Sequence, residues 1–461
     1  MKQPHMNLVA ALVIVICFIC FTYIVNGRDI ASPSMNIFLI FLISLLFNIL
    51  YREKWEVSFS SRFLTVLVTG FAATAAGDLL GRECGRRVIL GRKYRGGHEL
   101  AAGENYCISV PRLVNGAVII FMLITAAVYY RDMLRIASLY GDLSVQSVLQ
   151  AVRNATYMAG SSGDIEAGTS TVLSHAILLS KTLAYVYIYI FLFNLVFSRE
   201  RKKAADNIVY AVPPVIYLAE SVLSTSRSQI LYFFAGGCMM FYLLWNCRHG
   251  KISRKAKRKF IRYGVLLIVL FCVIFYLLGF LTRKSEAVTF LDNISVYIGG
   301  SLVSLNNWLE HFSETTEYFG EETLVGIRKL FYNLGLTDYY VVRHLDFTDF
   351  GMYRGNVYTA FRRYLSDFGY GGLFLLQMLS TFVFSFLYNK IKNRRTPGGL
   401  IILYGYIIYA AAMEAIDELF FSAVLEISNI YILIYGFFIY KLIVKRNLVN
   451  EKDILKDKRP S

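Results

Sequence analysis

The apolar run LFLLQMLSTFVFSFLY (residues 373–388) directly follows a polar, arginine-rich stretch, RHLDFTDFGMYRGNVYTAFRRYLSDFGYGG (residues 343–372). The apolar run approaches the length of a membrane-spanning helix, whereas the stretch before it carries too many charges to cross a bilayer. The chain therefore joins a charged, aromatic segment directly to a membrane helix. We interpret the rest of the sequence outward from this junction.

The composition is that of a polytopic membrane protein. The 461 residues are 56% hydrophobic and only 17% charged, and the mean hydropathy is +0.49. We predict an all-α integral membrane protein with about eleven transmembrane helices, plus or minus one. The expected spans are 8–25, 35–50, 63–80, 114–130, 172–197, 208–223, 230–245, 265–281, 373–388, 400–413 and 430–444.

Basic loops predict the orientation of these spans. Residues 248–262 hold eight Lys or Arg and no acid, and the positive-inside rule places such loops in the cytoplasm. Residues 1–281 then form helices one to eight, 282–372 one large extracytoplasmic loop, 373–446 helices nine to eleven, and 447–461 a cytoplasmic tail. The net charge of +16 sits largely in these loops, so we predict no nucleic-acid partner.

The N-terminal topology is the difficult part of this arrangement. Eleven spans with a cytoplasmic C-terminus place the N-terminus and residues 51–56 outside. Arg52 and Lys54 lie in that segment, and basic residues are expected on the inner side.

Residues 356–367 have the spacing of an amphipathic helix. Apolar side chains at 357, 360, 361, 364 and 365 fall on one face, so we expect this face to rest on the outer membrane surface. Asn356 can cap the start of the helix, and Gly369 can end it. A polar stripe on another face consists of Asn356, Thr359, Arg363 and Asp367.

Four arginines lie within 21 residues of this region: Arg343, Arg354, Arg362 and Arg363. Guanidinium groups bind phosphate oxygens through two parallel hydrogen bonds, so the cluster indicates an anion-binding site to which Asn356 and Thr359 contribute. The alternative is an ordinary surface helix on which Arg363 and Asp367 form an i, i+4 ion pair.

Arg227 and Glu220 form a second candidate pair. Arg227 lies in the short outward turn TSRSQ (225–229), and Glu220 lies seven residues earlier inside a predicted span. An ionisable group in the membrane is a functional candidate by default, so we assign Arg227 to anion binding and Glu220 to catalysis. The alternative is a structural Glu220–Arg227 pair.

Candidate general bases follow the same region. His344, next to Arg343, has a side chain suited to proton transfer near neutral pH, and Asp367 is a second candidate. The alternatives are a plain loop histidine and a carboxylate that orients Arg363. Three further acids, Glu414, Asp417 and Glu418, are candidates for orienting a sugar or taking a proton. The alternative for Asp417 and Glu418 is that they are solvated surface charges.

Motifs for bound cofactors are missing from the sequence. There is no nucleotide-binding loop of the Walker type and no HExxH, and the seven cysteines are scattered without zinc spacing. We therefore predict neither a metal nor a cofactor, so the free energy for any reaction must come with the substrate.

The segment GNVYTAFRRYLSDFGYGG (355–372) resembles bacterial oligosaccharide repeat-unit polymerases of the Wzy type. TSRSQ (225–229) and IGGSLVSLNNWL (298–309) support the resemblance, as does one large outer loop between basic inner loops. Some members carry an Arg and a Gly separated by ten residues in their outer loops. No arginine of the large outer loop here has a glycine at that spacing, so arginine roles are not carried over through that motif.

The resemblance implies a membrane glycosyltransferase at the outer face of the bacterial cytoplasmic membrane. Its substrates would be undecaprenyl-diphosphate-linked oligosaccharides, polymerised into O-antigen or capsule beside membrane lipid, a flippase and a chain-length regulator. The alternatives are a ligase that transfers finished polysaccharide, a flippase or transporter, and a structural membrane subunit. The long outer loop disfavours the transporter.

Overall fold

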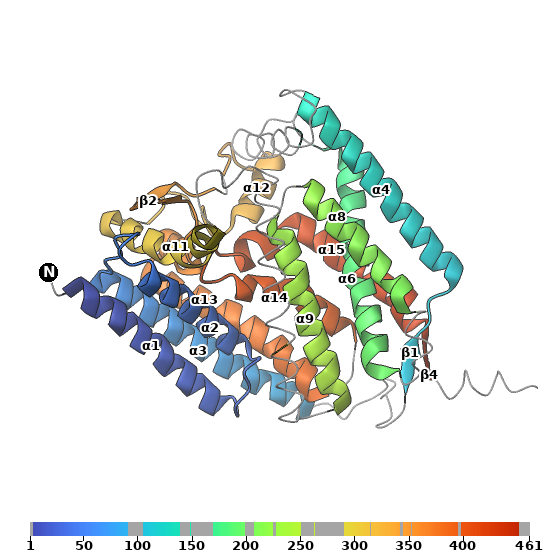
Figure 1. Cartoon of the computed structure of the whole chain (residues 1–461), viewed down its shortest axis with the longest axis horizontal. Helices are drawn as coiled ribbons and strands as arrows, with labels where there is room; N and C mark the ends of the chain where they lie inside the picture. Colours follow the sequence, from blue (N-terminus) through green and yellow to red (C-terminus); the bar gives the residue numbers. More distant parts are fainter. Residues whose placement is uncertain are drawn as a thin grey trace, which may run out of the picture. The chain divides into compact units, whose positions relative to one another are not determined.

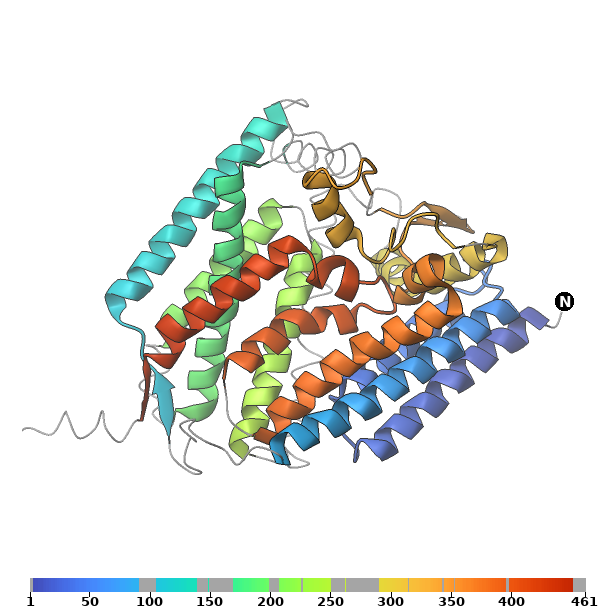
Figure 2. The same ribbon diagram turned by 180° about the vertical axis from the view of Figure 1, so that it is seen from behind.

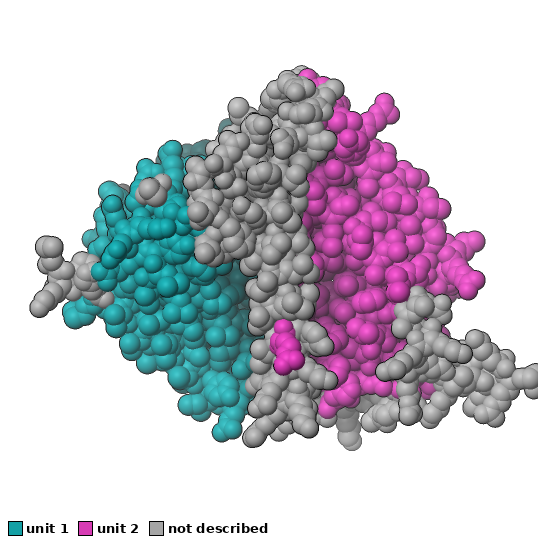
Figure 3. Space-filling view, viewed as in Figure 1, with its two compact units in different colours: residues 1–91, 287–390, 407–427 teal, residues 92–286, 391–406, 428–461 magenta. Residues whose placement is uncertain are grey.

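A computed structural model gives the fold of two compact units (Figure 3). Unit 1 contains residues 1–91, 287–390 and 407–427, and unit 2 contains residues 92–286, 391–406 and 428–461. Each unit joins segments that are distant in sequence, which the predicted linear division does not. The structure describes residues 3–90, 105–138, 148, 169–198, 207–224, 227–249, 262, 290–313, 315–341, 344–351, 353–394 and 398–450.

The protein is mostly helical, and the described ranges contain eight helices long and apolar enough to cross a membrane. Each of the eight overlaps a predicted span. They are Met6–Val25, Pro33–Leu50, Ser61–Arg87, Arg112–Ser138, Thr171–Phe197, Ser228–His249, Ala360–Asn393 and Ile427–Lys445. Two shorter apolar helices, Val209–Leu223 and Gly399–Ala412, overlap the predicted spans 208–223 and 400–413. The predicted span 265–281 lies outside the described residues.

Unit 1 combines long helices with the segments between them (Figure 1). Its elements are α1 (Gln3–Val25), α2 (Pro33–Leu50), α3 (Ser61–Leu90), α11 (Phe290–His311), α12 (Val325–Asn333), β2 (Thr348–Phe350), β3 (Tyr353–Gly355), most of α13 (Ala360–Arg394), the end of α14 (Gly399–Ala412) and the short π-helix η2 (Phe420–Val424).

A row of glycines brings α3 against α13, and both ribbon views show these helices side by side (Figures 1 and 2). A Cβ atom at Gly77 would lie 2.3 Å from the carbonyl oxygen of Met378, and one at Gly81 would lie 2.5 Å from that of Phe382. Small residues four apart let helix backbones approach this closely in a membrane. The glycine row therefore holds α13 firmly along its membrane part.

The helix predicted at 356–367 begins later than expected. α13 starts at Ala360, whose N–H group donates to the carbonyl oxygen of Glu414 at 2.8 Å. Asn356 precedes the helix and does not cap it. Gly369, with φ of 64°, interrupts the regular helix close to its predicted end, in a conformation that favours glycine.

The apolar face of this first part of α13 lies inside the protein. Phe361 and Tyr364 are almost fully buried, and the Phe361 ring stacks on Phe41 of α2 with 5.0 Å between ring centroids. The prediction that this face rests on the membrane surface is therefore wrong. Neighbouring helices of unit 1 cover it instead.

Residues 51–56 lie beside segments of the predicted outer loop. The Lys54 ammonium is 3.3 Å from a carboxylate oxygen of Asp292 in α11, and the Trp55 ring meets the Phe350 ring edge to face. Asp292 thus supplies a counter-charge for Lys54.

A buried carboxylate lies towards the opposite end of the α3–α13 pair. Asp78 accepts hydrogen bonds from Asn26 at 2.7 Å, from Ser34 at 2.5 Å, and from Ser385 of α13. Arg82, one turn later, donates to the Val25 carbonyl oxygen. These contacts join α3 and α13 to the connection between α1 and α2.

Unit 2 is a second group of helices in which α6 contacts three of the others. Its elements are β1 (Tyr106–Ile108), α4 (Arg112–Ser138), α6 (Thr171–Phe197), the 3-10 turn η1 (Val209–Ala211), α8 (Val212–Leu223), α9 (Arg227–His249), the start of α14, most of α15 (Ile427–Ile439), the π-helix η3 (Tyr440–Lys445) and β4 (Leu448–Asn450). β1 and β4 pair antiparallel, which ties the C-terminal segment to the start of α4.

Candidate functional site

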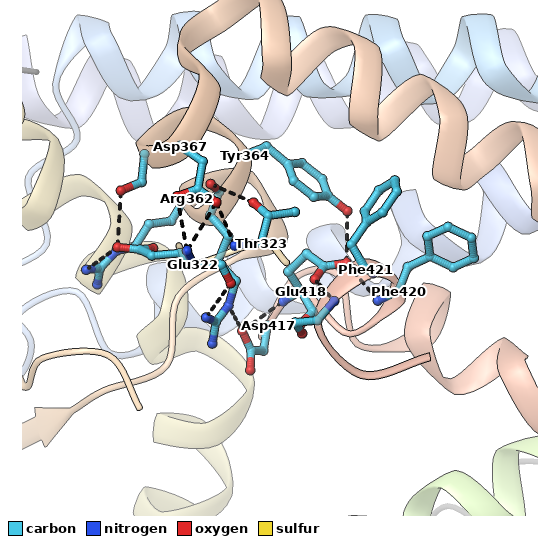
Figure 4. A network of polar contacts seen from close by, with 12 residues as sticks. Glu322, Thr323, Arg362, Tyr364, Asp367, Asp417, Glu418, Phe420 and Phe421 are labelled. Atoms are coloured by element: carbon cyan, nitrogen blue, oxygen red, sulfur yellow. Dashed lines mark hydrogen bonds and ion pairs between the residues drawn. The ribbon is translucent and has the colours of Figure 1, made fainter. Parts of the chain in front are cut away.

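A polar network surrounds the first turns of α13 at the end of unit 1 that also holds residues 51–56 (Figure 4). It is built from three stretches that are far apart in sequence: residues 316–323, 359–367 and 414–422. Most of its charged side chains are buried, so each one needs a partner.

Arg363 is the best-paired cation of the network. Its residue is only 2% exposed, its Nε donates to Asp417 Oδ1 at 2.9 Å, and its Nη1 donates to the Glu322 carbonyl oxygen at 3.0 Å. Asp367 forms no ion pair with it within the described part of the chain. The i, i+4 pair considered from the sequence is therefore wrong, and Arg363 instead joins two distant segments.

Asp367 holds a loop in place. Its carboxylate accepts the Thr316 hydroxyl at 2.8 Å, both oxygens accept the Glu322 N–H at 3.0 and 3.1 Å, and one accepts the Thr323 N–H at 2.6 Å. These donors use the lone pairs that a general base needs. The geometry favours a structural role for Asp367.

Glu418 stabilises the start of η2. Its carboxylate accepts the N–H groups of Phe420, Phe421 and Ser422 at 2.7–2.8 Å and the Tyr364 hydroxyl at 3.1 Å. Burial raises the pKa of Glu418, and the backbone donors oppose that rise. The side chain is buried, so the solvated alternative is wrong for Glu418.

Glu414 follows the end of α14 and contacts the middle of α13. Gln377 donates its amide to Glu414 Oε2 at 2.6 Å, while Glu414 Oε1 has no partner in the described part of the chain. Burial raises the pKa of Glu414 to about 8, so the neutral acid prevails at pH 7.

Arg362 differs from Arg363 because part of its guanidinium is left unpaired. The residue is 4% exposed, and its guanidinium lies 3.8 Å from the centroid of the Tyr358 ring and 5.1 Å from that of Trp308. Nη2 makes one long contact, 3.4 Å, to Glu322 Oε1. Among the described residues, neither Nε nor Nη1 has an acceptor. Arg362 is thus buried between two aromatic rings.

Glu322 is the counter-ion of Arg362, and its charge is only partly compensated. Burial raises the pKa of Glu322, while the positive charges of Arg362 and Arg363 oppose the rise. Ser366 donates to the same oxygen at 3.1 Å, and Oε2 has no partner in the described ranges. This long ion pair is thus weaker than the Arg363–Asp417 pair.

A cavity of about 520 Å³ adjoins the two rings that contact Arg362. Trp308 and Tyr358 form part of its wall, together with Trp55 from the segment between α2 and α3. Four acidic residues also line it: Glu56, Glu310, Asp346 and Asp349. No lysine or arginine is among the lining residues that the structure describes. His311, rather than His344, is the histidine in this wall.

The other predicted residues of unit 1 lie around this network. Arg354 is exposed in β3, 3.3 Å from Asp349, and its guanidinium lies over the Phe347 ring. Thr359 is buried directly before α13, and its hydroxyl has no described partner. His344 is exposed in a loop, and Asn356 is half-buried. Arg343 lies outside the described residues.

Glu220 and Arg227 belong to unit 2. Glu220 is buried in α8, and its Oε2 accepts the Ser180 hydroxyl at 2.7 Å. The next residue of α6, Lys181, donates to Gln229 at 3.0 Å. Arg227 is the first residue of α9, and its side chain is outside the description. The structure thus brings Arg362, Arg363 and Asp367 into one network, and it places Glu220 in another.

Sequence reasoning missed Glu322, Trp308 and the carboxylates of the cavity. For Glu322 and the cavity acids Glu310, Asp346 and Asp349, the available signal was the acidic and aromatic character of residues 310–349, which has no periodic spacing; Trp308 and Glu56 lie outside that stretch. Comparisons with protein-family models, with curated proteins and with solved structures gave no match for this chain.

Proposed function

We propose that this chain is a multi-pass membrane glycosyltransferase that polymerises undecaprenyl-diphosphate-linked oligosaccharide repeat units into surface polysaccharide. It would act at the outer face of the bacterial cytoplasmic membrane, with eleven spans and residues 282–372 as the extracytoplasmic loop. A flippase would supply its substrate, and a chain-length regulator would act beside it. The resemblance of residues 355–372 to Wzy-type polymerases is one support for this proposal.

The observation that carries the proposal is the incomplete pairing of Arg362. A buried donor without an acceptor costs about 1–3 kcal/mol, and more when it is charged. Two nitrogen atoms of one guanidinium, Nε and Nη1 of Arg362, are in that state among the described residues. A phosphate group at this guanidinium would supply acceptors to these nitrogens, and guanidinium groups bind phosphate oxygens strongly. We therefore assign Arg362 to the donor diphosphate.

The remaining arginines have other roles in this proposal. Arg363 donates hydrogen bonds to Asp417 and to a carbonyl oxygen of the loop at residues 316–323. These bonds fix the turn of α13 that also carries Arg362, so we give Arg363 a positioning role. Arg354 is exposed and paired with Asp349, so it lies at the margin of the site. Arg227 and Glu220 remain predictions for a second region, in unit 2.

The chemistry of the reaction fits this set of residues. A bond forms between the acceptor hydroxyl oxygen and C1 of the donor sugar, while the bond from C1 to the phosphate oxygen breaks. The diphosphate leaves with its negative charge, which Arg362 would stabilise. The hydroxyl proton passes to a base, and the cavity wall contains carboxylates and an imidazole able to take it.

A deletion strain separates this proposal from its rivals. A polymerase mutant transfers single repeat units to the acceptor, a ligase mutant transfers no glycan, and loss of a flippase leaves the lipid-linked units on the inner face. Surface glycan of unaltered length in the deletion strain would overturn the proposal.

Complementation then tests the residue assignment. Arg362→Lys keeps the positive charge but loses the planar guanidinium with its several N–H donors. We therefore expect at least a tenfold loss of chain extension at normal protein level. Arg354→Ala is the matched control, and we expect extension close to that of the wild type. Full activity of Arg362→Lys would contradict the assignment of the diphosphate to Arg362.

A further inference from the structure

The cavity beside Trp308 and Tyr358 has a chemistry distinct from that of Arg362. Its volume of about 520 Å³ falls in the range of small-molecule sites. Its wall carries four carboxylates, and no lysine or arginine is found among its described lining residues. Among the described residues, one cation, Arg354, pairs with these acids, at Asp349. Like charges repel across such short distances, so the cavity disfavours an anionic occupant.

The carboxylates of the wall narrow the ligand further. Ionised carboxylates can only accept hydrogen bonds, so an occupant must offer them donors. The hydroxyl groups of a sugar ring are such donors. Trp55 also lines the cavity, but its indole N–H is buried and is not offered to the occupant.

Aromatic rings complete the wall. Trp308 is half-buried and Phe347 is 49% exposed, so parts of both rings are open to a ligand. An aromatic face offers a large apolar surface to the C–H face of a sugar ring, and burial of such surfaces stabilises a complex. Open aromatic faces and hydrogen-bond-accepting carboxylates together match a polyhydroxylated ring.

We propose that this cavity is a subsite for a sugar ring without negative charge, next to the phosphate site at Arg362. This inference rests on the proposed function, because it gives the glycan of the lipid-linked substrate its place. It adds a restriction on substrate class: the ring bound here is a neutral or amino sugar and not a uronic acid.

The three tryptophans of the chain provide a direct readout. Trp245 lies in α9 of unit 2, whereas Trp55 and Trp308 both line the cavity. Full-length protein carrying Trp245→Phe, in nanodiscs, would therefore report ligand binding through cavity tryptophans alone. The probes are matched oligosaccharides of galactose and of galacturonic acid, neutral N-acetylglucosamine oligomers, and spermidine as a cation without hydroxyl groups.

We expect at least one neutral oligosaccharide to change the fluorescence saturably and to bind at least tenfold more tightly than the galacturonate counterpart. Trp308→Phe should reduce the signal, and Glu310→Gln, a change at an exposed side chain, should weaken the discrimination against galacturonate several-fold. Equal or tighter binding of galacturonate, tighter binding of spermidine, or no response to any neutral glycan would each overturn the subsite.

The two proposals fail separately. Saturable neutral-glycan binding in a protein whose deletion leaves the glycan length unaltered would keep the subsite and remove the polymerase. Loss of polymerisation in the deletion strain, without any neutral-glycan response in the titration, would remove only the subsite.

Discussion

Buried charge occurs at both ends of the α3–α13 pair, but its pairing differs. Around Asp78, three donors from three segments meet the two carboxylate oxygens, and no described buried atom of that cluster lacks a partner. Around Arg362, two of its own nitrogens, Nε and Nη1, and one oxygen of Glu322 lack partners among the described residues. Satisfied polar groups hold helices together, whereas unsatisfied ones mark a place for a ligand. This difference supports a structural role for the Asp78 end and the proposed binding role for the Arg362 end.

The largest effect should come from Arg363, which is the fully paired cation at the binding end. Arg363→Ala leaves Asp417 and Glu418 without their guanidinium, and breaking a buried pair costs about 3–5 kcal/mol. We expect a strong loss of folded protein, measured as the yield of monodisperse protein and the thermal midpoint in detergent. Arg362→Ala is the control and should retain more folded protein. Equal losses would remove the distinction between the two arginines.

Asp78→Ala tests the opposite end and should have the next largest effect. It removes the acceptor of three hydrogen bonds, each worth about 0.5–1.5 kcal/mol, so we expect a loss of about 2–3 kcal/mol in unfolding free energy. Asp78→Asn, which keeps the shape and one acceptor oxygen, should lose less. A binding site at this end would instead show a functional defect at normal stability.

The smallest effect is the pH dependence caused by Glu414. Its pKa is raised to about 8 in the folded protein, so the native state holds a proton that the unfolded chain releases near its ordinary value. The contribution of this proton to the free energy of unfolding is complete below the ordinary pKa of a glutamate. It is lost as the pH rises from that value to the folded pKa, at about 1.4 kcal/mol per pH unit. Thermal unfolding measured from pH 6 to 7 should show this decline, and Glu414→Gln should flatten it. An unchanged slope in that variant would assign the proton to another group.

Local pattern explains which parts of the fold could be predicted. The apolar spans and the break at Gly369 follow from composition and from glycine geometry over a few residues. The start of α13 was placed too early because its position depends on a hydrogen bond from Ala360 to Glu414, which is 54 residues away. Short-range spacing carries no information about such a bond.

The candidate site shows the same limit more strongly. Sequence identified Arg362, Arg363 and Asp367, but their partners Glu322 and Asp417 are 40 to 54 residues distant. Without the partners, the arginines looked like equivalent members of one anion-binding group. Only the three-dimensional contacts distinguish Arg363, whose guanidinium is paired, from Arg362, which has nitrogens without an acceptor among the described residues.

The glycine row has a mechanical consequence for the site. Because Gly77 and Gly81 let α3 pack directly against the backbone of α13, we expect the membrane part of this helix pair to be rigid. Gly369 has a non-helical backbone conformation and lies between this rigid part of α13 and the first turns, which carry Arg362. On the proposed function, a ligand bound at Arg362 would move the first turns of α13 about Gly369, while the closely packed part of the helix would keep its place beside the Asp78 cluster.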